Sequence, residues 1–75
     1  MSEAADNYLR DVGRLLLELA KEAKQRAQKE HGSYEKGEQM AFYAVLSLMK
    51  QQAVAFGLTE DAIGLDAVNL EREVL

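Results

Sequence analysis

Apolar residues recur at steps of three and four between residues 3 and 30, and this spacing predicts one long amphipathic helix. The apolar positions form two adjoining rows along that helix. One row holds Tyr8, Val12, Leu15, Leu19 and Ala23, and the other holds Leu9, Leu16, Ala20, Ala23 and Ala27. A helix that contacts a single partner needs only a narrow apolar stripe, so two rows predict two neighbouring elements.

A short break follows, and a second helix is predicted over about residues 34–56. Gly32 suits the left-handed cap that ends the first helix, and Ser33 suits the N-cap of the second. Because the connection is short, the two helices are expected to run antiparallel. The second helix has one polar stripe, made of Lys36, Gln39, Tyr43, Ser47 and Lys50. Its other positions are largely apolar, so we expect it to be more buried than the first helix.

The pattern weakens after the second helix. Gly57 followed by Leu58 predicts a Schellman ending, and residues 60–63 can form a short capped turn. Asp66 can cap a last short helix that runs through Glu71, but the apolar positions there fit neither the helical nor the strand period. We therefore expect residues 59–75 to pack partly across the hairpin or across its partner, with the last few residues frayed.

The predicted fold class is all-α: an antiparallel two-helix hairpin with a short C-terminal segment, in one domain. The chain has 75 residues, 48% of them hydrophobic, and contains no Cys that could form a stabilising disulfide. A core this small is marginal alone, so we expect a homodimer in which two hairpins form a four-helix bundle. The residues predicted to make the dimer contact are Leu9, Leu16, Phe42, Val45, Met49 and Phe56.

The net charge of −4 lies entirely in the C-terminal segment. Residues 1–57 carry eight acids and eight bases, whereas residues 58–75 carry five acids and only Arg72. A neutral body with an acidic tail is a poor ligand for phosphate backbones, so no nucleic-acid partner is expected. The acids that could instead contact a basic protein partner are Glu60, Asp61, Glu71 and Glu73.

The inventory of catalytic side chains is thin, and no catalytic residue, cofactor site or metal site is predicted. His31 is the single histidine and lies at a helix end, where a cation favours the helix dipole. The residue three before it is Gln28, so the Glu-x-x-His signature of di-iron bundles is absent. A helix-turn-helix built around Gly57 is disfavoured, because Glu60 and Asp61 would face DNA phosphates.

These observations favour a small cytoplasmic homodimer, bacterial in style, that serves as a protein–protein interaction module and not as an enzyme. The acidic N-terminus lacks the basic region of a secretory signal. The longest apolar run, residues 40–49, is far shorter than the ~20 residues of a membrane span, so no membrane contact is expected. One alternative is an inhibitor or immunity-type protein that uses the acidic segment. Another is a small apolar-ligand carrier or enzyme with its site between subunits, lined by Met40, Phe42, Met49 and Phe56.

Overall fold

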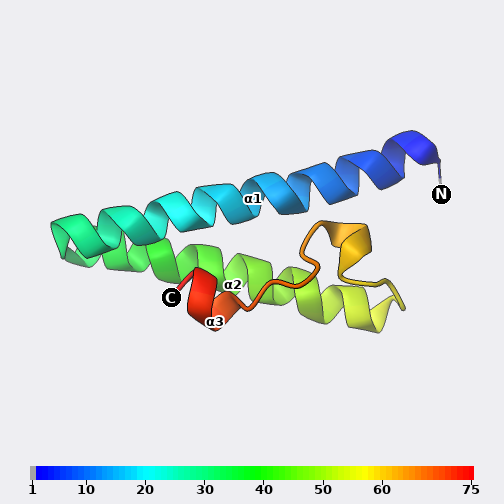
Figure 1. The fold of residues 1–75 in the computed structure, drawn as a ribbon. Coiled ribbons are helices and arrows are strands. Elements are labelled where there is room, and N and C mark those ends of the chain that lie inside the picture. Colours follow the sequence, from blue (N-terminus) through cyan, green and yellow to red (C-terminus); the bar gives the residue numbers. More distant parts are fainter. Residues whose placement is uncertain (1) are drawn as a thin grey trace.

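A computed structural model describes residues 2–75, and helices are its only regular elements over that range (Figure 1). The two long helices α1 (Glu3–Glu30) and α2 (Ser33–Ala55) pack against each other in antiparallel orientation. After them come a single turn of 3-10 helix, η1 (Asp61–Ile63), and the short helix α3 (Leu70–Glu73). The bounds of both long helices match the sequence prediction to within one residue.

The turn between α1 and α2 is shifted by one residue from the prediction. His31, and not Gly32, takes the left-handed conformation (φ 58°), and its backbone N–H donates to the Ala27 carbonyl over 3.0 Å. Gly32 is then the N-cap of α2, and Ser33 is its first helical residue. Only two residues connect the helices, so the left-handed residue must be the first of them, and histidine is among the side chains that tolerate this conformation.

The end of α2 confirms the Schellman prediction. Gly57 is left-handed (φ 70°), its N–H donates to the Val54 carbonyl over 3.1 Å, and the Leu58 N–H donates to the Ala53 carbonyl over 2.8 Å. This pair of bonds satisfies the last free carbonyls of α2 and turns the chain back along the hairpin. Gly57 therefore sets the direction in which residues 58–75, the C-terminal segment, return.

The C-terminal segment forms part of the core. The largest fully buried side chains are Leu46 of α2 with Leu65 and Val74 of this segment, while Ile63 and Leu70 are nearly as buried. The expectation of frayed final residues was therefore wrong, because Val74 is an anchor that fills the groove between α1 and α2. The last helix also begins later than predicted, with Asn69 as its N-cap.

The segment covers the row of α2 that the sequence pattern had marked as polar. Lys50 donates its ammonium to the Val68 carbonyl over 2.7 Å, and Gln39 donates its amide to the Val74 carbonyl over 2.8 Å. The Val68 and Val74 carbonyls accept no hydrogen bond within a helix, and these side chains supply the donors they need. This stripe of α2 is polar because its side chains donate hydrogen bonds to the irregular backbone of the C-terminal segment. Exposure to solvent does not by itself account for it.

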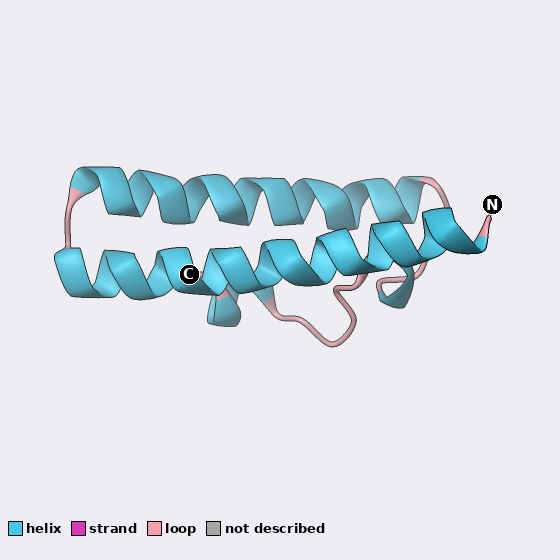
Figure 2. Ribbon diagram, turned by 90° about the horizontal axis from the view of Figure 1, so that it is seen from above, coloured by secondary structure: helices cyan, strands magenta, loops and turns pink. Residues whose placement is uncertain are grey.

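The helix α2 is less buried than α1, contrary to the prediction. Within α2, Leu46 and Ala53 are buried, whereas α1 buries Gly13, Leu17, Ala20, Ala23 and Ala27. The C-terminal segment covers one side of the hairpin. On the opposite side, Phe42 and Met49 of α2 are half-buried and pack against the core, whereas Val45 and Phe56 are exposed. In the view from above, none of the C-terminal segment lies over the two long helices (Figure 2).

Candidate protein interaction surface

The side of the hairpin opposite α3 carries two apolar hollows, and we call this side the open face. The C-terminal segment reaches its edge through Leu58 and Ile63. The first hollow has a volume of about 160 Å³ and is lined by Leu9, Met49, Gln52, Ala53, Phe56, Leu58 and Ile63. The second has a volume of about 250 Å³ and is lined by Leu16, Glu38, Ala41, Phe42 and Val45. All six residues predicted to make a dimer contact therefore line one of the two hollows.

Helical spacing places these residues on one face. Leu9 and Leu16 are seven positions apart on α1, as are Phe42, Met49 and Phe56 along α2. Seven residues are close to two helical turns, so each set lies in line along its helix. The structure thus brings the six residues together on one continuous surface.

The open face exposes large apolar side chains to solvent. Phe56 retains 76% of its accessible surface and Val45 retains 45%. On α1 the neighbouring row is also exposed, with Tyr8, Leu15 and Leu19 all in contact with solvent. The two rows predicted for α1 differ in the structure: Ala20, Ala27 and the shared Ala23 are buried, whereas Tyr8, Leu15 and Leu19 of the first row are exposed.

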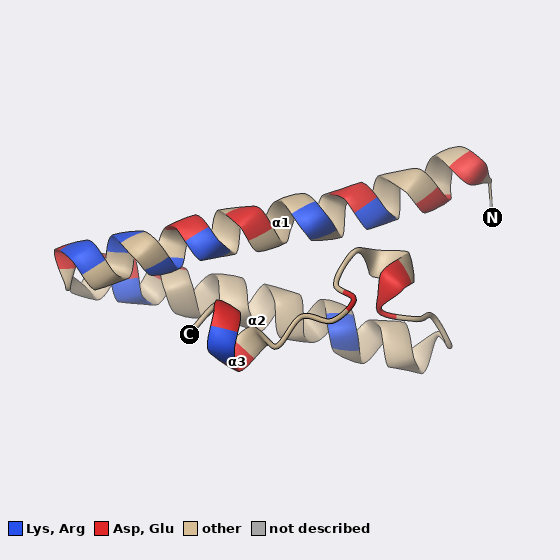
Figure 3. Cartoon of the chain, viewed as in Figure 1, with Lys and Arg blue, Asp and Glu red and all other residues tan. Residues whose placement is uncertain are grey.

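The helix α2 is uncharged along most of its length (Figure 3). Lys50 is the only charged residue between Glu38 and Glu60, and it points to the C-terminal segment, where it also pairs with Glu60 over 3.2 Å. At the turn end of the face, Arg26 of α1 pairs with Glu38 over 2.9 Å. A long apolar surface without charges is typical of protein interfaces, which are depleted of charge at their centre.

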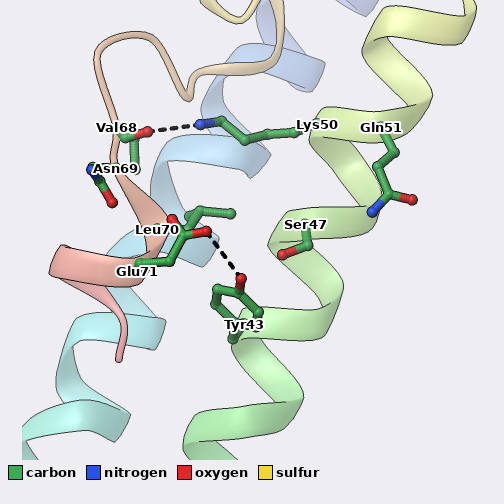
Figure 4. A pocket seen from close by; sticks show the side chains of 8 residues that line it. All are labelled: Tyr43, Ser47, Lys50, Gln51, Val68, Asn69, Leu70 and Glu71. Atoms are coloured by element: carbon green, nitrogen blue, oxygen red, sulfur yellow. Dashed lines mark hydrogen bonds between the residues drawn. The ribbon is translucent and has the colours of Figure 1, made fainter.

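A third hollow is polar and lies between α2 and the C-terminal segment (Figure 4). It has a volume of about 480 Å³, and its ionisable groups are bonded to the chain itself. Lys50 donates to the Val68 carbonyl, and the Tyr43 hydroxyl donates to the Glu71 carboxylate over 3.2 Å. These bonds hold the segment on α2, which gives the polar side chains a structural role.

The four acids proposed as a partner contact do not form one surface. Glu60 and Asp61 lie at η1, whereas Glu71 and Glu73 lie on α3, and Figure 3 shows the two acidic groups apart. Glu73 pairs with Lys21 over 3.3 Å and accepts the Asn69 backbone N–H over 3.0 Å. The Asn69 bond first and then Lys21 lower the pKa of Glu73 from its ordinary value of 4.5. Three of the four acids thus have a bonding partner within the chain, the exception being Asp61.

Sequence reasoning missed the residues that bind the C-terminal segment. Besides Gln39 and Lys50, Lys24 of α1 donates its ammonium to the Arg72 carbonyl over 2.8 Å. The acceptors are backbone carbonyls, which carry no sequence signature. The spacing of Gln39 and Lys50 on one face of α2 was the available signal, but the same spacing is typical of a solvated stripe.

Comparison of the chain with protein-family models, with curated proteins and with solved structures found no match in any of the three. Within residues 2–75, no group of three or more His, Asp or Glu side chains is placed to hold a metal ion. Over the same residues, neither long helix combines the length and hydrophobicity that crossing a bilayer requires.

Proposed function

We propose that this chain is a small cytoplasmic protein–protein interaction module that acts as a homodimer, with the open face as its self-association surface. The observation that carries the proposal is the largely apolar face on which Leu9, Leu16, Phe42, Val45, Met49 and Phe56 line two hollows, with the Arg26–Glu38 ion pair at its turn end. Two hairpins joined through this face form a four-helix bundle.

The surface area of the single chain supports association. The chain exposes 5071 Å². A monomer of this mass, 8.4 kDa, is expected to expose about 4,600 Å². The excess comes from an elongated hairpin whose open face no other element covers. A standard interface buries roughly 800 Å² per partner, and an interface on the open face would remove Val45 and Phe56 from water.

The size of the hollows favours a protein partner over a small ligand. Ligand pockets usually enclose roughly 300–1,000 Å³. The two hollows of the open face measure about 160 Å³ and about 250 Å³, and each has a single polar side chain in its lining, Gln52 in the first and Glu38 in the second. Hollows of this size suit single side chains from another helix, in the manner of knobs that enter holes.

Matched valine substitutions on α2 test the proposal. Val45 lies on the open face, while Val54, which is 80% exposed, lies outside both hollows. Val45→Asp buries an unpaired charge in the dimer, so we expect a helical monomer by light scattering coupled to size-exclusion chromatography. Val54→Asp is expected to remain a dimer like the wild type.

Two results would contradict the proposal. One is a wild-type chain that stays monomeric at about 100 μM, a concentration above the micromolar dissociation constants of weak specific complexes. The other is a Val45→Asp variant that dimerises as tightly as Val54→Asp. Circular dichroism of each variant shows whether the hairpin itself is intact.

The inhibitor or immunity-type alternative has less support in the structure. It assigns partner binding to the acidic segment, yet Glu60, Glu71 and Glu73 already bond to Lys50, Tyr43 and Lys21 of the same chain. A basic partner would have to compete with these bonds. The carrier or enzyme alternative places an apolar site between subunits, and each apolar hollow of the open face is smaller than a usual ligand pocket.

A further inference from the structure

The C-terminal segment is attached to the hairpin in two different ways. Its first part, at η1, approaches α1 through its backbone, since a β-carbon on Gly64 would overlap the Arg10 carbonyl. Residues 68–75, which we call the strap, are attached through side chains. Within residues 2–75, the backbone-to-backbone hydrogen bonds of the strap join two of its own residues, such as the Val74 N–H and the Leu70 carbonyl over 2.9 Å.

The strap bridges the two long helices. The Arg72 carbonyl accepts the Lys24 ammonium of α1. The Val74 carbonyl accepts the Gln39 amide of α2. Leu70 and Val74 are four positions apart, so one helical turn directs both side chains toward the hairpin, where they are 4% and 0% exposed. The groove between the helices thus binds a short stretch of chain by donors to its carbonyls and by two apolar anchors.

The strap is joined to the rest of the chain through a strained residue. Ala67 takes the left-handed conformation (φ 57°), which is unfavourable for residues other than glycine because the β-carbon crowds the following carbonyl oxygen. The Ala67 side chain is exposed, so it makes no buried contact that would offset this strain. A change of Ala67 to an extended backbone relieves the strain and redirects the strap away from the hairpin.

We infer that the strap is a reversible cover that opens about Ala67, and that the groove beneath it binds a partner peptide of the same pattern. The closed strap is the groove's own occupant and competes with that peptide. The apparent affinity for the peptide is therefore reduced in proportion to the fraction of chains that are open. The inference is independent of the proposed homodimer, because no strap residue lines either hollow of the open face.

The closed strap shows which peptide fits the groove. Lys21 pairs with the Glu73 carboxylate over 3.3 Å. The Tyr43 hydroxyl donates to the Glu71 carboxylate over 3.2 Å (Figure 4). Both acids lie between the apolar anchors in the stretch 70–74. The partner is therefore one helical turn with apolar residues at its two ends and acidic residues between them.

Hydrogen exchange of the full chain tests the opening. If the strap opens while the hairpin stays folded, the Val74 amide exchanges faster than the Leu65 and Leu46 amides. Ala67→Gly removes the strain of the closed state and should slow exchange at Val74 about fivefold. Ala67→Val places a β-branched side chain in the left-handed region, so it should speed this exchange by at least about fivefold.

Gly37→Ala is the matched control, because it lies within α2 and a β-carbon there meets no other atom within 4 Å. The higher helix propensity of alanine stabilises the hairpin in both the closed and the open chain. This variant should therefore slow exchange at Leu46 and leave exchange at Val74 unchanged. Equal slowing at both amides would overturn the inference, because the strap would then open only when the whole chain unfolds.

A labelled peptide tests the groove as a binding site. The probe is a synthetic peptide with the sequence of residues 68–75, added to the full chain and followed by fluorescence polarisation. Its apparent affinity should rise about fivefold from Ala67→Gly to wild type and again to Ala67→Val, as the open fraction rises. A peptide that carries Leu70→Asp and Val74→Asp should bind none of the three chains. Equal affinity for the three chains, or no binding to Ala67→Val, would overturn the peptide site.

Discussion

The carbonyl of Ile63 lies against the backbone of Gly13 so closely that no β-carbon fits between them. This contact joins the middle of α1 to η1 and brings the Ile63 side chain, which is 3% exposed, into the core. Gly64 makes the reciprocal approach, since a β-carbon there would overlap the Arg10 carbonyl. Close backbone contact at these two glycines therefore sets how deeply the C-terminal segment enters the hairpin.

Gly13→Ala is expected to destabilise the fold by about 1–3 kcal/mol, because the added methyl group must displace the Ile63 carbonyl. Gly37→Ala is the matched control, since Gly37 is also helical and a β-carbon there meets no other atom within 4 Å. The unfolding free energy of this control variant should rise by up to about 1 kcal/mol, because alanine has a higher helix propensity than glycine. Urea denaturation followed by circular dichroism measures both, and equal stability of the two variants would contradict the close contact.

Leu65→Ala is expected to cost about 2–5 kcal/mol, because its side chain is fully buried and its removal leaves a cavity against the hairpin. Leu75→Ala removes the same atoms from a side chain that is 41% exposed, and it should change stability little. Thermal unfolding compares the two. A Leu65→Ala variant as stable as Leu75→Ala would mean that the C-terminal segment contributes nothing to the core.

Glu73 is expected to make stability depend on pH. Its pKa is lowered in the folded chain, chiefly by the Asn69 backbone N–H and then by Lys21, so the ionised form is the one that stabilises the fold. Wild type should therefore exceed Glu73→Gln in unfolding free energy at neutral pH. This advantage should shrink as the pH falls below the ordinary value of 4.5 and vanish below the lowered folded pKa. Asp61→Asn, at an exposed acid, provides the comparison, and parallel pH profiles for both variants would refute the assignment to Glu73.

Neutralising the acids of the C-terminal segment separates the two candidate surfaces. The variant with Glu60→Gln, Asp61→Asn, Glu71→Gln and Glu73→Gln should lose stability, since Lys50 and Lys21 lose their ion-pair partners. It should still dimerise, because none of the four acids lines the hollows of the open face. Sedimentation, at a concentration where the variant is folded, measures its oligomeric state. A folded monomer would mean that the interface lies on the acidic segment and not on the open face.

The long helices were predictable because their signals are local. Apolar spacing marks α1 and α2, and the break before Ser33 and the left-handed Gly57 mark where they end. The one-residue shift at His31 arose because glycine is the usual left-handed residue, whereas a two-residue connection requires that conformation at its first position. At this position the geometry of the two-residue turn outweighed the usual preference for glycine in the left-handed conformation.

The position of the C-terminal segment was not predictable in the same way. Its anchors Leu65, Leu70 and Val74 follow no period, because an irregular chain meets the hairpin wherever its backbone permits. Lys24 and Lys50 bind this segment through its backbone carbonyls. Because every residue has a backbone carbonyl, these contacts leave no signal in the sequence. For the open face the reverse holds, since Phe42, Val45 and Met49 follow one another at steps of three and four, which places them on one face of α2.

Beside its buried anchors, the returning segment is held by main-chain oxygens at Val68, Arg72 and Val74. Those three bonds are indifferent to which side chains the segment displays outward. Asp66 and Arg72 have exposed side chains that make no bond to the hairpin within residues 2–75, so both positions are open to replacement while the buried anchors stay. The outer surface of this segment can therefore change its charge without loosening its attachment to the hairpin.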